Sequence, residues 1–277
     1  MNSSYLLSIV TFIYGLAAFL YTASWVFKKK LLGTAAKWIA ITGILCNTAG
    51  IVLRWIESYS LGIGHAPLSN MYESLVFFAW TIILIYLVIE YRYKNKITGL
   101  LATPLAFMAM AYASLSPNVS SRIQPLIPAL KSNWLIAHVV TCFLGYAAFA
   151  IAFGVSLLYI FRKKNKPGKI GVFFHFPELD VLDELTYQTV TFGFLFLTIG
   201  IITGSVWANS AWGSYWSWDP KETWSLITWF IYATLLHARM VRGWAGKRIA
   251  YLSIIGFLAV IFTYFGVNLL PGLHSYG

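Results

Sequence analysis

Trp134–Phe161 reads WLIAHVVTCFLGYAAFAIAFGVSLLYIF and contains no Asp, Glu, Lys or Arg. The hydrocarbon core of a bilayer is about 30 Å thick, and about 20 apolar residues cross it as an α-helix. The eight spans expected from such runs are Tyr5–Phe27, Lys37–Ile56, Met71–Glu90, Ile97–Leu115, Trp134–Phe161, Tyr187–Ala208, Thr223–Ala238 and Ile249–Leu270. The sequence therefore predicts an all-α fold, a polytopic transmembrane helical bundle of about eight spans that forms a single domain over residues 1–277.

The composition agrees with a chain whose surface faces lipid. Hydrophobic residues make up 59% of the chain and charged residues 10%, whereas a soluble domain carries about 25% charged residues. The first apolar run lacks the basic region and small-residue cleavage site of a signal peptide, so we expect it to be a retained span. Cys46 and Cys142 each lie alone in an apolar run, which is typical of small apolar fillers and not of a zinc site or redox pair.

The net charge of +11 is explained by the topology. Basic residues gather on alternate connections between the spans, and loops rich in lysine and arginine stay cytoplasmic. Both termini and the connections near 57–70, 116–133 and 209–222 are therefore expected outside, and the charge does not indicate nucleic-acid binding. The cytoplasmic basic residues are Lys28, Lys29, Lys30, Lys37, Arg92, Lys94, Lys96, Arg162, Lys163, Lys164, Lys166, Lys169, Arg239, Arg242, Lys247 and Arg248.

The connection over residues 162–186 is the longest one expected in the cytoplasm. Leu179, Leu182 and Leu185 share one helical face there, and acidic residues occupy the other. This spacing predicts an amphipathic helix that lies on the membrane surface or against another helix.

Residues 207–226 are expected to form an outer loop rich in tryptophan, with WGSYWSWDPKETW over 212–224. An aromatic belt at the membrane surface is one interpretation, but a belt spreads its rings over both faces. Rings crowded into one loop favour a platform for a broad, flat, apolar ligand. Asp219, Pro220 and Glu222 also fit the N-cap, N1 and N3 positions of the next helix. Lys221 and that helix N-terminus suit ligand carboxylates.

The histidines supply candidate metal ligands. His138 and His274 are expected near the outer face, and His237 within the seventh span toward its cytoplasmic end. Neutral imidazole is a good ligand for haem iron, and two imidazoles complete six-coordination. The alternative for any one of them is a hydrogen-bonded interfacial residue. His175 is expected to be a solvated loop residue, and the residue pattern does not decide whether His65 binds anything.

The segment HAPLSNMYES over 65–74 is expected to be an outer loop that enters the third span. Asn70 fits its N-cap and Glu73 its N3 position. Arg54, near the outer end of the second span, is expected to snorkel toward the membrane surface, with a pair to Glu57 or to a ligand carboxylate as alternatives.

The stretch over 212–224 resembles the tryptophan-rich WWD signature of the haem-handling proteins of cytochrome c biogenesis. Within that group the chain resembles the CcsA/ResC branch, labelled CcsB in some bacteria, of the System II pathway. Supporting segments are HAPLSNMYES at 65–74, LLHAR at 235–239 and GLHSYG at 272–277. The resemblance covers nearly the whole chain.

The resemblance implies that the protein binds haem b and presents it at the outer face for covalent attachment to the Cys-x-x-Cys-His motif of apocytochrome c. His138 and His274 match the family's outer iron ligands, and His237 matches its membrane-embedded histidine. No catalytic residue separate from the haem ligands is implied. The candidate haem-binding residues are His65, His138, His237, His274, Trp212, Trp216, Trp218, Asp219 and Trp224.

The implied partners are a CcsB/ResB-type membrane protein, apocytochrome c, thiol-reducing factors and the lipid membrane. The chain looks like the unfused form, because it has no extra N-terminal spans that would carry such a partner domain. It would then be part of a cytochrome c synthase complex. We expect a multi-pass protein of a bacterial inner (plasma) membrane, with a thylakoid membrane as the alternative, since nothing suggests a transit peptide.

Two other functions remain open from the sequence. One is a haem exporter or chaperone without synthase activity, which uses the same fold and the same loop. The other is a non-catalytic assembly or regulatory membrane protein whose tryptophans lie at the membrane interface.

Overall fold

The computed structural model describes residues 2–93, 96–126, 130–164 and 177–270. Within these residues the chain forms eight α-helices and no β-strand, which confirms the all-α prediction. Seven of these helices are long and apolar enough to cross a membrane. The remaining one, α7 (Pro220–Arg242), has 23 residues, or about 35 Å at 1.5 Å per residue. Charged residues near both of its ends lower its mean hydropathy.

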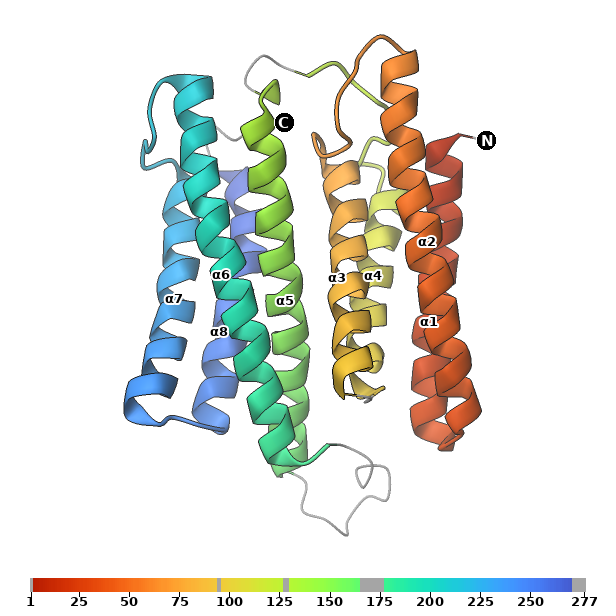
Figure 1. Ribbon diagram of the computed structural model, residues 1–277, viewed down its shortest axis with the longest axis vertical. Coiled ribbons are helices and arrows are strands. Elements are labelled where there is room, and N and C mark those ends of the chain that lie inside the picture. Colours follow the sequence, from red (N-terminus) through yellow and green to blue (C-terminus); the bar gives the residue numbers. More distant parts are fainter. Residues whose placement is uncertain (1, 94–95, 127–129, 165–176, 271–277) are drawn as a thin grey trace. The chain divides into compact units, whose positions relative to one another are not determined.

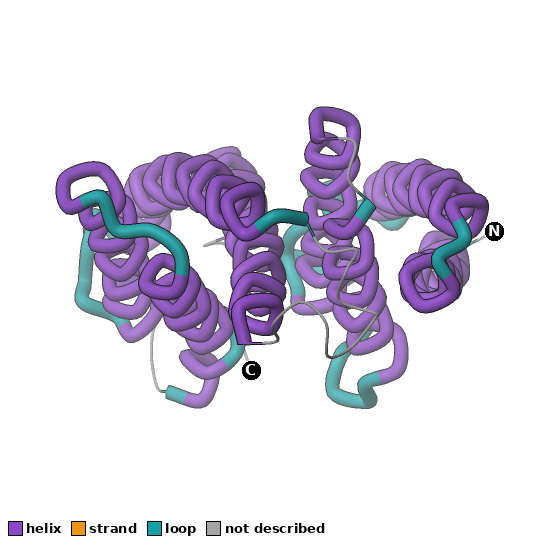
Figure 2. The backbone as a smooth tube through the Cα atoms, turned by 90° about the horizontal axis from the view of Figure 1, so that it is seen from below, coloured by secondary structure: helices purple, strands orange, loops and turns teal. Residues whose placement is uncertain are grey.

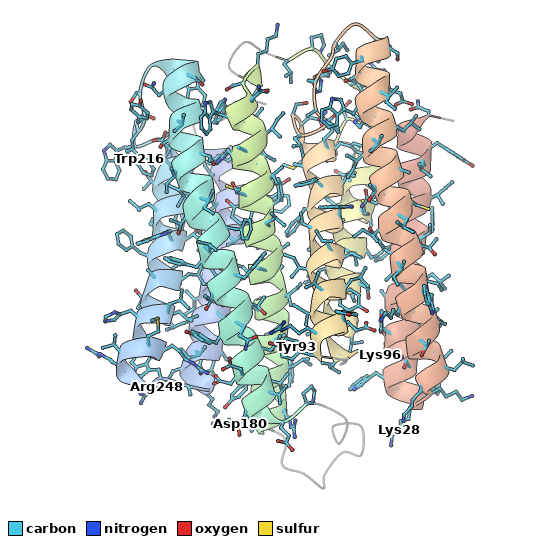
Figure 3. The ribbon with its side chains drawn as sticks, in the orientation of Figure 1. Lys28, Tyr93, Lys96, Asp180, Trp216 and Arg248 are labelled. Carbon is cyan, nitrogen blue, oxygen red and sulfur yellow. The ribbon has the colours of Figure 1, made fainter. Side chains whose placement is uncertain are left out.

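Contacts along the chain divide it into two compact units, Met1–Lys131 and Ser132–Gly277. The N-terminal unit contains α1 (Ser3–Phe27), α2 (Lys30–Ser60), α3 (Met71–Tyr93) and α4 (Ile97–Leu115) (Figure 1). In this unit α1 packs along α2 and α4, and α3 packs along α4. Lys28 and Lys96 lie at the same end of the unit (Figure 3). There Lys96 Nζ donates to Thr34 Oγ1 at 2.7 Å.

The C-terminal unit contains α5 (Asn133–Lys164), α6 (Leu179–Trp212), α7, α8 (Lys247–Tyr264) and the short 3₁₀ helix η3 (Gly266–Leu269). Here α5 packs along both α6 and α8, and α7 packs along α8. Figure 2 looks at the helices of each unit from one end and shows the bundle arrangement within each.

Helix α6 is longer than a bilayer core requires. Its 34 residues span about 51 Å, against about 30 Å of hydrocarbon. Trp216, just past its C-terminal end, and Asp180, in its first turn, lie at opposite ends of the C-terminal unit (Figure 3). The tryptophan-rich segment is therefore held at one end of this unit, beyond the apolar middle of the helices.

The amphipathic segment predicted within residues 162–186 forms the first turns of α6, as far as it lies within the described residues. Leu182 and Leu185 are buried, and the Asp183 carboxylate pairs with Arg239 of α7. The same carboxylate accepts a hydrogen bond at 2.7 Å from the backbone N–H of Gly246, just before α8. These contacts place the segment against other helices of the unit.

Arg54 does not snorkel, which corrects the expectation from the sequence. Its side chain is 2% exposed, and its Nε lies 2.8 Å from Oε1 of Glu73, whose side chain is fully buried. The guanidinium also lies 5.0 Å from the centre of the Tyr72 ring. Glu57, the pairing partner considered from the sequence, instead accepts hydrogen bonds from the backbone N–H and hydroxyl of Ser3. A buried ion pair therefore joins α2 to the start of α3.

Candidate functional site

The tryptophan-rich segment is mostly helical. Helix α6 continues to Trp212 and ends at Gly213, whose φ of 76° is the left-handed C-cap conformation that glycine adopts readily. Helix α7 then begins at Pro220. The non-helical part is therefore residues 213–219, which is shorter than the loop over 207–226 expected from the sequence. Two rigid helix ends hold most of its tryptophans.

The start of α7 is a capping box, as the sequence predicts. Asp219 is 6% exposed, and its carboxylate accepts the Lys221 backbone N–H at 2.8 Å. Glu222 Oε2 reaches back to the backbone N–H groups of Asp219 at 3.2 Å and Ser217 at 2.8 Å. Between them Trp218 has a φ of 59°, a left-handed conformation that is uncommon for a bulky residue. The box thus fixes the segment in one conformation.

The tryptophans form three groups in the C-terminal unit. Trp207 is buried and meets Trp212 edge to face, with ring centres 4.9 Å apart. Trp216 meets Trp218 in the same way at 5.8 Å, and Trp218 is 68% exposed. Trp224 lies 4.2 Å from the ring of Phe262 of α8. The segment therefore exposes the Trp218 ring, whereas Trp207 and Trp224 pack against other aromatic rings.

His138 of α5 lies against the end of α6. Its ring is stacked on that of Trp207, at 5.9 Å between centres and 17° between planes. Its Nδ1 lies 2.8 Å from the carbonyl oxygen of Gly200. Because a carbonyl oxygen can only accept, Nδ1 carries the hydrogen and Nε2 carries the lone pair of the neutral ring. Of the predicted iron ligands within the described residues, His138 is thus the one that the structure brings to the tryptophans.

Lys221 lies in the first turn of α7, outside the predicted span Thr223–Ala238. Burial lowers the pKa of its ammonium group, and the Asp219 carboxylate opposes that shift. The Cys142 thiol of α5 also lies within electrostatic reach of this ammonium. His138 lies one helical turn before Cys142 on α5. The Lys221 ammonium is therefore in the same part of the unit as His138.

His237 lies near the other end of α7 and is exposed. On the same face of the helix are Thr234 and Phe230, which are also exposed. Among the described residues, no hydrogen bond of His237 is found. The structure therefore does not bring His237 to the tryptophan-rich segment.

His65, in the N-terminal unit, is buried at 7% exposure and held by backbone groups. Its Nδ1 lies 2.8 Å from the carbonyl oxygen of Ala66, and its Nε2 lies 3.0 Å from that of Gln124. Ser58 Oγ accepts its backbone N–H at 3.1 Å. Each ring nitrogen of His65 therefore already faces a carbonyl oxygen. This arrangement suits a structural contact between two loops better than a ligand of a metal ion. His274 and His175 lie outside the described residues.

A little further along that loop, the start of α3 departs from the simple capping box. Asn70 Oδ1 accepts the Glu73 backbone N–H at 2.9 Å, as expected for the N-cap. The Glu73 carboxylate, however, accepts from the backbone and hydroxyl of Ser69, at 2.9 and 2.8 Å, and pairs with Arg54. Capping therefore explains only part of the role of Glu73.

The His138 seat is the surface of α6, formed by Gly200, Gly204 and Trp207, against which the His138 ring lies. Its two glycines are residues that sequence reasoning missed. A Cβ atom at position 204 would lie 2.6 Å from His138 Nδ1, and one at position 200 would lie 2.6 Å from Cys142 Sγ. The absence of side chains at Gly200 and Gly204 therefore lets α5 approach. Their spacing of four residues within an apolar run is the small-residue pattern of close helix packing, and it could have indicated this contact.

Residues 68–274 match the family described as cytochrome C assembly protein. A protein of Guillardia theta named cytochrome c biogenesis protein CcsA is 44% identical, over 85% of this chain and 84% of its own length. Proteins of the same name from Prochlorococcus marinus (strain NATL1A) and Chlamydomonas reinhardtii are 41% and 44% identical. They cover 95% and 87% of this chain, and 93% and 69% of their own lengths.

Among solved structures, one named cytochrome c heme lyase CcmF matches with a TM-score of 0.69 at 16% identity. The match covers 97% of this chain and 50% of that chain, so this protein spans half the length of that structure. It shows a shared fold. The family match and the identities above 40% show more: the chain is a multi-pass membrane protein of cytochrome c biogenesis that belongs to the cytochrome c assembly protein family.

Proposed function

We propose that the protein binds haem b and presents it, on the outer side of the membrane, for covalent attachment to the Cys-x-x-Cys-His motif of an apocytochrome c. The observation that carries this proposal is the seat of His138. Its ring stacks on Trp207, and the Gly200 carbonyl holds Nδ1 so that Nε2 carries the lone pair. A histidine oriented through its other nitrogen is the usual arrangement of an imidazole that binds a metal.

The second outer ligand in this proposal is His274. The family resemblance suggests it, because the segment GLHSYG matches there. Two neutral imidazoles complete the coordination of haem iron. The exposed ring of Trp218 and its neighbour Trp216 supply surface on which the porphyrin stacks.

The attachment reaction needs positioning more than acid or base groups. Each cysteine S–H adds across a haem vinyl C=C bond, so that one C–S bond and one C–H bond form and nothing is released. The protein contributes by holding haem in one orientation and by excluding water from its faces. The capping box around Asp219 supports that role, since it fixes the tryptophan-rich segment.

The charge pattern supports an outer location of this site. Trp216 lies at one end of the C-terminal unit, and Arg248, in the first turn of α8 beside the basic connection from α7, lies at the other (Figure 3). Basic connections stay cytoplasmic. We therefore place the tryptophan-rich segment outside.

His237 fits a second haem position within the membrane. It is exposed on one face of α7 beside Phe230 and Thr234. An ionisable group at membrane depth is costly unless a ligand or another protein covers it. We propose that haem and a CcsB/ResB-type partner, which supplies the other ligand, cover this face.

The test is an absorption spectrum of the complex, purified with a CcsB/ResB-type protein from haem-replete cells. We expect His138→Gly to lose holocytochrome formation and the part of the low-spin haem signal that the outer site contributes, while haem at the His237 position remains. Ala137→Gly, which adds the same backbone freedom one position away, should keep both. Normal haem binding and cytochrome c maturation in His138→Gly would overturn the proposal.

A second measurement separates a synthase from a haem exporter or chaperone. The purified complex, loaded with haem, is mixed with reduced apocytochrome c. We expect thioether-linked haem to form on the apocytochrome. Haem that stays bound, or passes to the apocytochrome without covalent linkage, would instead indicate an exporter or chaperone.

A further inference from the structure

A hydrogen bond from His138 Nδ1 to the carbonyl oxygen of Gly200 joins α5 to α6. Gly200 and Gly204 have no side chain that would keep α5 and the imidazole ring away from α6. The Nδ1–oxygen distance is 2.8 Å. The same carbonyl also accepts the Thr203 hydroxyl at 3.1 Å, so it is a shared acceptor. Cys142 Sγ lies farther from Nδ1, at 3.6 Å. The carbonyl is therefore the nearer acceptor of the imidazole hydrogen.

We propose that Gly200 and Gly204 are positioning residues for haem ligation by His138, with the Gly200 carbonyl setting its tautomer and Gly204 leaving room for its ring. A Cβ atom at position 204 would lie 2.6 Å from Nδ1 and 2.8 Å from Cε1. An alanine there pushes the ring away from α6. The inference rests on the proposed function, because it concerns how His138 presents Nε2 to iron.

The chemical nature of the hydrogen-bond acceptor has a consequence for the transfer of haem. A carboxylate bonded to Nδ1 makes a ligating imidazole more basic and the metal bond stronger. An uncharged carbonyl leaves the ring closer to an ordinary neutral imidazole. Such a ligand holds haem and still yields it to the histidine of the Cys-x-x-Cys-His motif. The carbonyl at position 200 therefore suits a protein that must give its haem away.

The first test compares two glycine substitutions in the purified complex. We expect Gly204→Ala to lower the low-spin haem retained at the outer site by about 10- to 100-fold, the usual cost of disturbing the group that orients a metal ligand. Added imidazole should restore part of the low-spin spectrum. Gly256→Ala is the matched control, since its Cβ would lie 2.6 Å from the Tyr232 ring, on another helix pair of the unit. It should keep the spectrum at equal folded protein.

The second test changes the acceptor near Nδ1. Cys142→Asp sets a carboxylate close to that nitrogen, in reach of the Lys221 ammonium. We expect a more negative midpoint potential of the bound haem and slower transfer to apocytochrome. Cys142→Asn, of similar size and without charge, should change neither.

The outcomes separate this inference from the proposed function. If His138→Gly keeps its haem spectrum, the proposed function fails. If His138→Gly loses the outer-site part of the spectrum while Gly204→Ala keeps it, the positioning role of Gly204 is wrong and the proposed function stands. An unchanged midpoint potential in folded, haem-bound Cys142→Asp overturns the role assigned to the carbonyl.

Discussion

Two histidines of this chain, one in each compact unit, use backbone carbonyls in different ways. His65 has a carbonyl oxygen at 2.8 Å from one ring nitrogen and another at 3.0 Å from the other. His138 has one carbonyl oxygen at 2.8 Å from Nδ1 and a tryptophan ring stacked on its face. The first arrangement joins two loops, and the second fixes one ring orientation and tautomer, as the proposed iron ligand requires. Both histidines were expected in outer segments from the sequence, and it is their hydrogen-bond partners that distinguish them.

The largest expected effect is on the stability of the N-terminal unit, at the ion pair near the His65 loop. Arg54→Met leaves the buried Glu73 carboxylate without its cation, which costs about 3–5 kcal/mol. We expect a strongly lowered melting temperature of the purified protein in detergent. The double substitution Arg54→Met with Glu73→Met should recover most of that loss, because an apolar pair replaces the charges. If Arg54→Met melts like the unchanged protein, the buried pair does not stabilise the fold.

The substitution His65→Ala tests the contrast between His65 and His138 most directly. It removes the ring that lies between two part-buried carbonyl oxygens, of which a neutral imidazole donates to one, so the lost hydrogen bond costs about 1 kcal/mol. We expect a lower melting temperature and an unchanged haem spectrum per folded molecule. Ile63→Ala, in the same loop, is the control for a general loosening. Loss of the haem spectrum without loss of stability would instead make His65 a ligand, and the contrast with His138 would disappear.

Trp207→Phe tests the stacking of the His138 ring on Trp207. The smaller ring keeps an aromatic contact and loses part of the overlap, and aromatic pairs contribute about 0.5–1.5 kcal/mol beyond burial. We expect haem affinity, measured by titration of the purified complex, to fall by about 2- to 10-fold. Trp244→Phe, whose ring lies under Arg248 at the opposite end of the unit, should bind haem normally. Equal losses in both variants would show a general effect of removing indole rings.

The helices were predictable from sequence because their signal is local. Runs of apolar residues gave all eight positions, and Ile97–Leu115 agrees at both ends with α4. The capping box at Asp219 was predictable for the same reason, since its partners lie three residues apart. The extent of the tryptophan-rich loop was not. Helix α6 runs through Trp207 to Trp212, because a Gly at the left-handed C-cap, and not the apolar pattern, ends it.

Contacts between distant residues could not be read from the pattern. Arg54 and Glu73 are separated by 19 positions, and the partner within the chain that spacing suggested for Arg54 was Glu57, three residues away. The Gly200–His138 contact joins residues 62 positions apart. Only packing decides which side chain meets which backbone group. The predicted helix positions limit the options, and the tertiary fold selects among them.

The smallest expected effect distinguishes two roles of Asp219. As an N-cap it accepts the Lys221 backbone N–H at 2.8 Å, and asparagine caps a helix about as well as aspartate. Asp219→Asn should therefore change stability and haem spectrum by very little, while Asp219→Ala should cost about 1 kcal/mol. A ligand role that needs the negative charge predicts the reverse, with haem binding lost in both variants. Melting curves and haem spectra of the two proteins decide between them, because asparagine keeps the size and the capping oxygen of aspartate without its charge.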